Sequence, residues 1–152
     1  IRRQRQMCIR DSIGKAVSLK VDDRIKALLL VPDNQLATAK ARKLLPESIS
    51  HQDAVLNSSR TALLVHALAE RPDLLFTATQ DLLHQSYRAQ AMPKTIALVD
   101  KLRGAGLAAV VSGAGPSVMV LYSGGEDEID QLQSIAPGFN AMKLSIAKAG
   151  VQ

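Results

Sequence analysis

Residues 108–122 read AAVVSGAGPSVMVLY, and this stretch decides the fold. Two apolar runs, Ala108–Ser112 and Ser117–Tyr122, flank a turn that contains two glycines and a proline. Glycine adopts positive φ without steric penalty, so the chain can reverse tightly here. Strands joined by so short a connection must be antiparallel. The stretch therefore predicts two antiparallel strands joined by a tight turn.

The same turn is also a candidate anion-binding loop. Gly113 and Gly115 stand between Ser112 and Ser117, which leaves backbone N–H groups without side-chain cover. Such loops form nests for phosphates and carboxylates. The loop is not a Walker loop, because no Lys-Ser or Lys-Thr follows it, and no helix follows as a dinucleotide fingerprint requires. A plain hairpin turn remains the alternative interpretation.

Further strands and helices are expected on both sides of this hairpin. Period-two alternation or a continuous apolar run predicts three more strands. They are Ala16–Val21, Ile25–Pro32 and Asn140–Ala147. The order of strands and helices predicts an α+β fold, with a mostly antiparallel sheet and helices packed on one face, as in ferredoxin-like domains.

Caps and prolines set the limits of the expected helices. Ser50 and Asp53 form an acidic capping box at the start of a long helix that runs to about residue 70. The apolar residues of this helix are expected to face the core. The other expected helices are Thr38–Leu45, Pro72–Leu83, Pro93–Gly104 and Glu126–Ile135. Residues 84–92 show no helical period and are expected to form a loop.

Composition limits the classes of function. The chain has 152 residues, of which 47% are hydrophobic and 22% charged, enough for one domain with a core. No apolar run approaches the ~20 residues that a membrane span needs. The single cysteine, Cys8, excludes an internal disulfide. Aromatic residues are 3% of the chain, too few for platforms that stack single-stranded nucleic acid. We therefore expect neither a membrane nor a nucleic-acid partner.

The net charge of +5 is concentrated at one end of the chain. Residues 1–12 contain four arginines and one aspartate, whereas the other 140 residues carry 15 basic and 13 acidic side chains. We expect residues 1–12 to be a non-native or disordered basic tail and residues 13–152 to be the domain. A basic arm that binds nucleic acid is the alternative.

Three polar side chains outside the loop are further candidates for a binding site. Thr38 and Arg42 are four residues apart and share one face of the expected helix. Arg88 lies in the polar stretch before Pro93, where a solvated arginine is the alternative. The three histidines lack the spacing of metal ligands, so no metal site is expected. No residue suggests a catalytic nucleophile or general base.

Four segments of the chain resemble, in the same order, the homoserine kinases, a family within the GHMP superfamily of small-molecule kinases. The resemblance extends from about residue 16 to about residue 147. The glycine loop is shared across the superfamily, whereas the second and third segments are more specific to homoserine kinases. The four segments are Thr38-x-x-x-Arg42 with Leu44-Leu45-Pro46, Ser50-His51-x-Asp53-Ala54-Val55-x-Asn57-x-x-Arg60, Asp81-x-x-His84-Gln85-x-Tyr87-Arg88, and Ser112–Ser117.

This resemblance implies a cytoplasmic, two-domain enzyme of threonine biosynthesis that phosphorylates the L-homoserine hydroxyl with ATP. An N-terminal domain, absent from this sequence, would bind most of the ATP and Mg²⁺ through a Gly-Leu-Gly-Ser-Ser type loop. This chain would be the C-terminal, substrate-side domain and inactive alone. The resemblance also implies a homodimer.

The resemblance also implies which residues bind substrate. It assigns Thr38, Arg42 and Arg88 to the amino acid, and Gly113 and Gly115 to the junction of substrate and phosphates. Arginine suits this role because its planar fork binds a carboxylate in bidentate fashion. The cofactor-binding residues stay unknown.

Two other functions remain open. The chain could belong to another GHMP small-molecule kinase, or it could be a non-catalytic, ferredoxin-like module that binds an amino acid. If a second domain is missing, the strand Ile25–Pro32 and the nearby turn should expose an apolar patch.

The coding sequence upstream of Ile13 separates these alternatives. We expect it to encode a Gly-Leu-Gly-Ser-Ser type loop in the same reading frame. Sequencing of the source DNA checks this expectation. A native start codon near Ile13 with no such loop upstream would favour the binding module.

Overall fold

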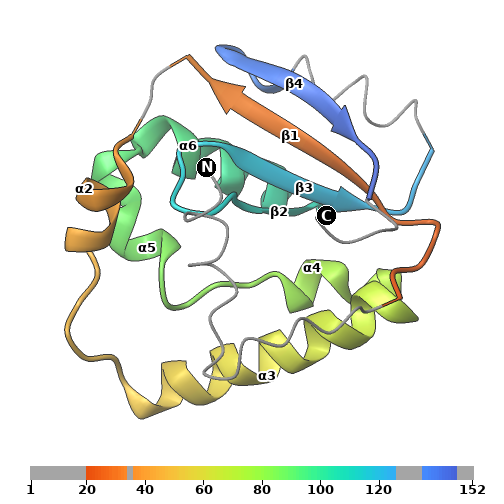
Figure 1. Ribbon diagram of the computed structural model, residues 1–152, viewed down its shortest axis with the longest axis horizontal. Helices are drawn as coiled ribbons and strands as arrows, with labels where there is room; N and C mark the ends of the chain where they lie inside the picture. Colours follow the sequence, from red (N-terminus) through yellow and green to blue (C-terminus); the bar gives the residue numbers. More distant parts are fainter. Residues whose placement is uncertain (1–19, 34–35, 126–134, 147–152) are drawn as a thin grey trace, which may run out of the picture.

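The computed structural model describes residues 20–33, 36–125 and 135–146. These residues form an α+β fold in which one sheet is accompanied by several helices (Figure 1). The strands are β1 (Lys26–Pro32), β2 (Ala108–Val111), β3 (Val118–Tyr122) and β4 (Phe139–Leu144). The helices are α2 (Thr38–Lys43), α3 (His51–Ala69), α4 (Leu75–Ala78), α5 (Gln85–Arg88) and α6 (Pro93–Gly104), with the 3₁₀ turns η1 (Pro72–Leu74) and η2 (Ala89–Ala91).

The four strands form one antiparallel sheet in the order β2-β3-β1-β4. The expected pair around the glycine loop is confirmed, because Val111 of β2 stands opposite Val118 of β3. The predicted α+β class with an antiparallel sheet is therefore confirmed. β2 is an edge strand, so one side of its backbone is left without a neighbouring strand.

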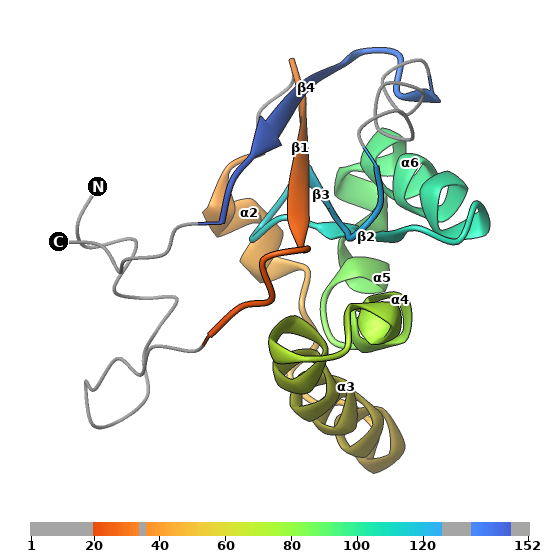
Figure 2. The same cartoon turned by 90° about the vertical axis from the view of Figure 1, so that its right-hand side faces the viewer.

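The main core lies between the sheet and α6 (Figure 2). Side chains alternate across a strand, so Leu28 and Leu30 of β1 share a face with Val118 and Val120 of β3. Leu102 of α6 packs against this face and is fully buried. Burial of these side chains supplies the hydrophobic stabilisation of the sheet.

A second apolar cluster joins α3 and α4 to the sheet. Ala67 of α3, together with Leu75 and Ala78 of α4, packs with Ile25 and Ala108. Both views show α3 and α4 below the sheet (Figures 1 and 2). The cluster therefore connects the two helices to the starts of β1 and β2.

The long helix α3 begins as predicted but buries less than predicted. The Ser50 side chain accepts a hydrogen bond from the Asp53 N–H at 3.0 Å, which confirms the cap. The prediction that most of its apolar residues face the core was wrong. Val55, Leu56 and Val65 are 49%, 38% and 45% exposed. The reason is geometric, because the N-terminal half of α3 extends away from the sheet (Figure 1).

The exposed apolar patch expected on Ile25–Pro32 is not there. β1 lies between β3 and β4, so its apolar side chains are buried or half-buried. Among the described residues, large exposed apolar side chains lie instead on α3, and at Ile49, Phe76, Tyr87 and Met142.

Two local predictions around α4 and α5 were wrong. The helix expected over Pro72–Leu83 ends at Ala78, and residues 84–92, expected to be a loop, contain α5 and η2. The Asp81 carboxylate accepts hydrogen bonds from the backbone N–H groups of Leu83, His84 and Gln85. This side chain replaces the missing helical acceptors and starts α5.

Other expectations fall partly or wholly outside the described residues. They concern the tail 1–12, residues 16–19 of the first expected strand, and residues 126–134 of the last expected helix. Lys20 and Val21, which are described, are not in a strand. Within the described ranges, no helix is long and apolar enough to cross a membrane.

Replacement of Leu102 by alanine should destabilise the domain strongly. The fully buried side chain leaves a cavity against the sheet, so we expect a loss of about 2–5 kcal/mol in the free energy of unfolding. Urea denaturation measures the loss. Met142→Ala on β4 is the control, because Met142 is 51% exposed and its truncation should change stability little. Equal losses in both variants would contradict this account of the core.

Candidate functional site

The glycine loop between β2 and β3 has a defined shape. The Ser112 N–H donates to the Ser117 carbonyl at 2.8 Å, and the Gly115 N–H donates to the Ser112 carbonyl at 3.0 Å. Gly113 and Gly115 have backbone φ angles of +61° and +82°, a region that residues other than glycine rarely adopt. The loop is therefore a closed turn whose form depends on both glycines.

The two glycines meet different surroundings. A Cβ placed on Gly115 would lie 2.6 Å from the Met92 sulfur, whereas one on Gly113 would have no neighbour within 4 Å. Gly115 thus packs closely against buried Met92. Gly113 faces open space, which leaves its backbone accessible to a small molecule.

Three side chains bind the backbone of this loop and the adjoining strand end. The Gln85 Oε1 accepts from the Val111 N–H at 2.6 Å, and Arg88 Nη1 donates to the Gly113 carbonyl at 3.2 Å. From α6, Thr95 Oγ1 donates to the Pro116 carbonyl at 2.7 Å. Short helices on either side thus hold the loop in place. Neither Gln85 nor Thr95 was among the predicted site residues, although Gln85 lies in a segment that the resemblance covers.

Arg88 is the most unusual side chain of the site. It is only 6% exposed, and its Nε is buried without a hydrogen-bond partner. No carboxylate in the described part of the chain forms an ion pair with it. Burial of a charge without a partner is costly, so such a group calls for an anion. The free Nε donor beside Gly113 is therefore a candidate contact for a carboxylate or a phosphate.

Thr38 and Arg42 form no hydrogen bond to this cluster within the described ranges. Both are on α2 and exposed, whereas Ala41 between them is fully buried. Neither side chain forms a hydrogen bond or an ion pair within the described ranges. The structure thus joins Arg88 to Gly113, with Gly115 two residues further on, and leaves Thr38 and Arg42 free on a separate helix.

Polar side chains on α3 support the segment that carries Arg88. Asn57 Oδ1 accepts from the Leu82 N–H at 3.1 Å, and Arg60 Nε donates to Gln80 Oε1 at 2.8 Å. The Nδ1 atom of His84 lies 3.0 Å from Asp81 Oδ1. Asn57, Arg60 and His84 thus help to hold the segment that leads to Arg88. No cluster of three or more potential metal ligands occurs among the residues that the structure describes.

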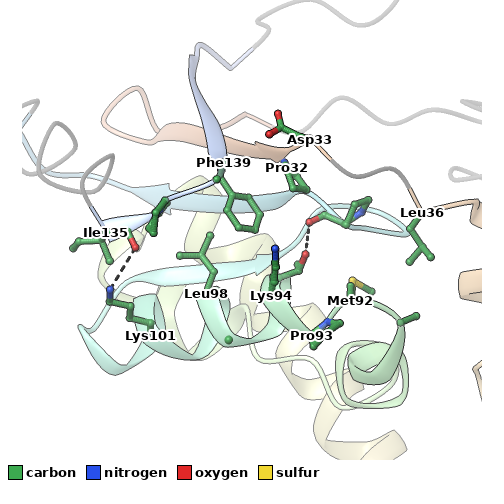
Figure 3. Close-up of a pocket in the computed structure, with 17 residues that line it drawn as sticks. Pro32, Asp33, Leu36, Met92, Pro93, Lys94, Leu98, Lys101, Ile135 and Phe139 are labelled. Atoms are coloured by element: carbon green, nitrogen blue, oxygen red, sulfur yellow. Dashed lines mark hydrogen bonds between the residues drawn. The ribbon is translucent and has the colours of Figure 1, made fainter.

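A cavity of about 630 Å³ lies behind the glycine loop, between α6 and the ends of β1 and β4 (Figure 3). Its walls are largely apolar and include Met92, Leu98, Pro116 and Phe139. Lys101 Nζ reaches the Ile135 carbonyl at 3.4 Å across one end. Neither Arg88 nor Gly113 lines this cavity, so it is separate from the candidate anion site.

The fold and the loop place this chain in a known class. The GHMP kinase C-terminal family model matches residues 59–137, just over half of the chain. The chain belongs to this family.

Comparison with individual proteins narrows the resemblance. The chain is 48% identical over 123 residues to the homoserine kinase of Streptomyces coelicolor, an alignment that covers 81% of this chain and 39% of that protein. It is 59% identical over 99 residues to the homoserine kinase of Leifsonia xyli. This alignment covers 65% of this chain and 31% of that protein. The resemblance to homoserine kinases is therefore confirmed, and the chain spans about 40% or less of the length of these two relatives.

A solved structure shows the same fold. The homoserine kinase from Cytophaga hutchinsonii superimposes with a TM-score of 0.74 at 24% identity, over 86% of this chain and 44% of that chain. At this level of identity the comparison supports the fold alone.

Replacement of Gly115 by alanine should cost more stability than replacement of Gly113. Both variants force a side chain into positive φ, a penalty of about 1–2 kcal/mol. Gly115→Ala also crowds Met92, which should add about 1 kcal/mol. Urea denaturation of both variants measures the difference, which should shrink in a Met92→Ala background, where the Val111 side chain, 3.2 Å from the added Cβ, is the remaining close neighbour. A larger loss for Gly113→Ala would show that Met92 does not constrain the loop.

Proposed function

We propose that residues 13–152 form the substrate-side domain of a homoserine kinase, which in full length transfers a phosphoryl group from ATP to the hydroxyl of L-homoserine. Membership of the GHMP kinase C-terminal family and the similarity to homoserine kinases support this proposal. The single observation that carries it is the buried, unpaired guanidinium of Arg88 beside the glycine loop. Homoserine carries an α-carboxylate, which could form the ion pair that Arg88 does not make within the described residues.

The geometry of Arg88 suits a carboxylate. Its Nη1 is already bound to the Gly113 carbonyl, which fixes the plane of the guanidinium. The Nε donor on the other edge is buried and has no hydrogen-bond partner, so a carboxylate that reached it would satisfy it. A charge-assisted bond of this kind is roughly twice as strong as a neutral one. A Cβ placed on Gly113 would have no neighbour within 4 Å, which leaves room for a substrate to approach the loop there.

Thr38 and Arg42 would form the second part of the substrate site. Their exposed side chains on α2 leave a hydroxyl and a second guanidinium available to the amino acid. In this proposal Arg88 anchors the carboxylate, Arg42 and Thr38 complete its binding, and Gly113 and Gly115 shape the junction with the phosphates.

The reaction itself requires parts that this chain does not supply. ATP and Mg²⁺ would be bound mainly by an N-terminal domain of the longer protein, and none of the residues described here is assigned to them. Phosphoryl transfer depends chiefly on positioning and on neutralisation of charge. The contribution of this chain is to orient the acceptor, so the chain alone should not turn over. A cytoplasmic location and a homodimer belong to the same proposal.

A chimeric enzyme tests the proposed function. The N-terminal region of the Leifsonia xyli homoserine kinase, joined to residues 13–152 of this chain, should phosphorylate homoserine. Arg88→Met in this chimera should raise the KM for homoserine about a hundredfold, because charge-assisted hydrogen bonds are lost. Coupled assays of ADP release measure both constants.

Arg71→Met serves as the matched control. Arg71 is an exposed arginine that pairs with Asp73 at 2.7 Å, away from the glycine loop, so its loss should leave the KM unchanged. An active chimera whose KM does not respond to Arg88→Met would contradict the assigned role of Arg88. A folded chimera without homoserine kinase activity would contradict the proposed function.

A further inference from the structure

The outer edge of β2 is covered by side chains. β2 has no strand beyond it, so every second residue turns a backbone group outward. Arg103 Nη1 donates to the Ala109 carbonyl at 3.1 Å, and Gln85 Oε1 accepts from the Val111 N–H at 2.6 Å. In the turn that follows β2, Arg88 Nη1 donates to the Gly113 carbonyl. Three backbone groups along β2 and this turn are therefore bound by side chains, and two of these side chains come from α5.

The two α5 side chains act from the same face of a very short helix. Gln85 and Arg88 are three residues apart, so both point toward β2. A helix of four residues has little stability of its own, and its direction depends on outside contacts. Asp81 accepts the Gln85 N–H at 2.6 Å and fixes the start of α5. The Gln85 side chain then fixes α5 against the strand.

We propose that Gln85 is a positioning residue for Arg88. By accepting the Val111 N–H, its amide holds α5 at the distance from β2 at which Arg88 Nη1 reaches the Gly113 carbonyl. The Nε donor is then held beside the glycine loop, buried and without a hydrogen-bond partner. The identity of the anion as the homoserine carboxylate rests on the proposed function, whereas the positioning does not.

Arg103 shows what a purely structural contact on this edge looks like. Besides the Ala109 carbonyl, its guanidinium binds Thr79 Oγ1 and the Phe76 carbonyl, and it stacks 4.5 Å from the centre of the Phe76 ring. Those contacts use both terminal nitrogens and leave Arg103 tied to its neighbours. Arg88 has one such bond, so its place depends on what holds α5.

Nuclear magnetic resonance of the full chain with ¹⁵N-labelled arginine tests the proposal. The Nε–H signal of Arg88 is identified by its loss in Arg88→Lys. In the wild-type chain, L-homoserine should shift this signal. In Gln85→Met, which keeps the length of the side chain but removes the acceptor, the affinity should fall about tenfold, the effect of one lost hydrogen bond. Gln85→Asn, which is one methylene shorter, should show the same loss and serves if the methionine variant does not fold.

Gln52→Met is the matched control. Gln52 is an exposed glutamine in the first turn of α3, and its side chain forms no hydrogen bond within the part of the chain that the structure describes. Its replacement makes the same chemical change without touching α5, β2 or the segment before α5, so the affinity should equal that of the wild type. Unchanged affinity in both Gln85 variants would overturn the proposal.

Hydrogen exchange of the Arg88 Nε–H, measured without ligand, tests the positioning role of Gln85 independently of the proposed function. If homoserine leaves the wild-type Arg88 signal unchanged, the proposed function fails for this chain. The positioning role is then judged by exchange of the Arg88 Nε–H with water. Exchange should be about tenfold faster in the Gln85 variants than in Gln52→Met, since a hydrogen bond that orders α5 is lost. Equal exchange rates would overturn the positioning role.

Discussion

The guanidinium of Arg88 is buried next to the glycine loop, where its Nη1 donates to the Gly113 carbonyl. A buried positive charge with so little compensation opposes folding. The structure retains it because α5, β2 and the loop together hold it in one place. Much of the local architecture follows from this constraint: the capped start of α5, the covered edge of β2 and the two glycines with positive φ. The capped start of α5 and the covered edge of β2 would be unnecessary in a simple hairpin.

The rest of the domain supplies a rigid frame for this charge. β2 and β3 are anchored in the core by residues such as Val118 and Val120, and α6 packs across them through Leu102. Thr95, from the same helix, binds the Pro116 carbonyl at the far end of the loop. The loop is thus fixed from the core side by α6 and from the edge side by α5. A site held between two rigid elements loses little conformational entropy when a ligand binds.

Much of the fold was accessible from the sequence because its strong patterns are local. The apolar runs around Gly113 and Gly115, the Ser50 cap and the proline at the start of α6 each act through near neighbours in the chain. The course of residues 79–92 was not accessible in this way. Asp81 starts α5 by hydrogen bonds that no hydrophobic period reveals. The exposure of Val55 and Val65 was also missed, because amphipathic pattern alone does not show what lies opposite a helix.

The candidate site also contains some residues that could be predicted from the sequence and some that could not. Gly113 and Arg88 could be named from sequence and resemblance, and the structure joins them directly. Burial of Arg88 could not be foreseen, since an arginine in a polar stretch is ordinarily solvated. The parts played by Gln85 and Thr95 depend on contacts 26 and 21 residues apart in the chain, which only the fold brings together.

The central claim is that the buried guanidinium of Arg88 binds the carboxylate of a ligand. Isothermal titration of the chain with L-homoserine and with 3-aminopropan-1-ol, the same molecule without its carboxylate, tests this claim most directly. The account predicts that homoserine binds at least about tenfold more tightly, because only homoserine can pair with the buried guanidinium. Equal binding of the two compounds, or binding of neither, would contradict it.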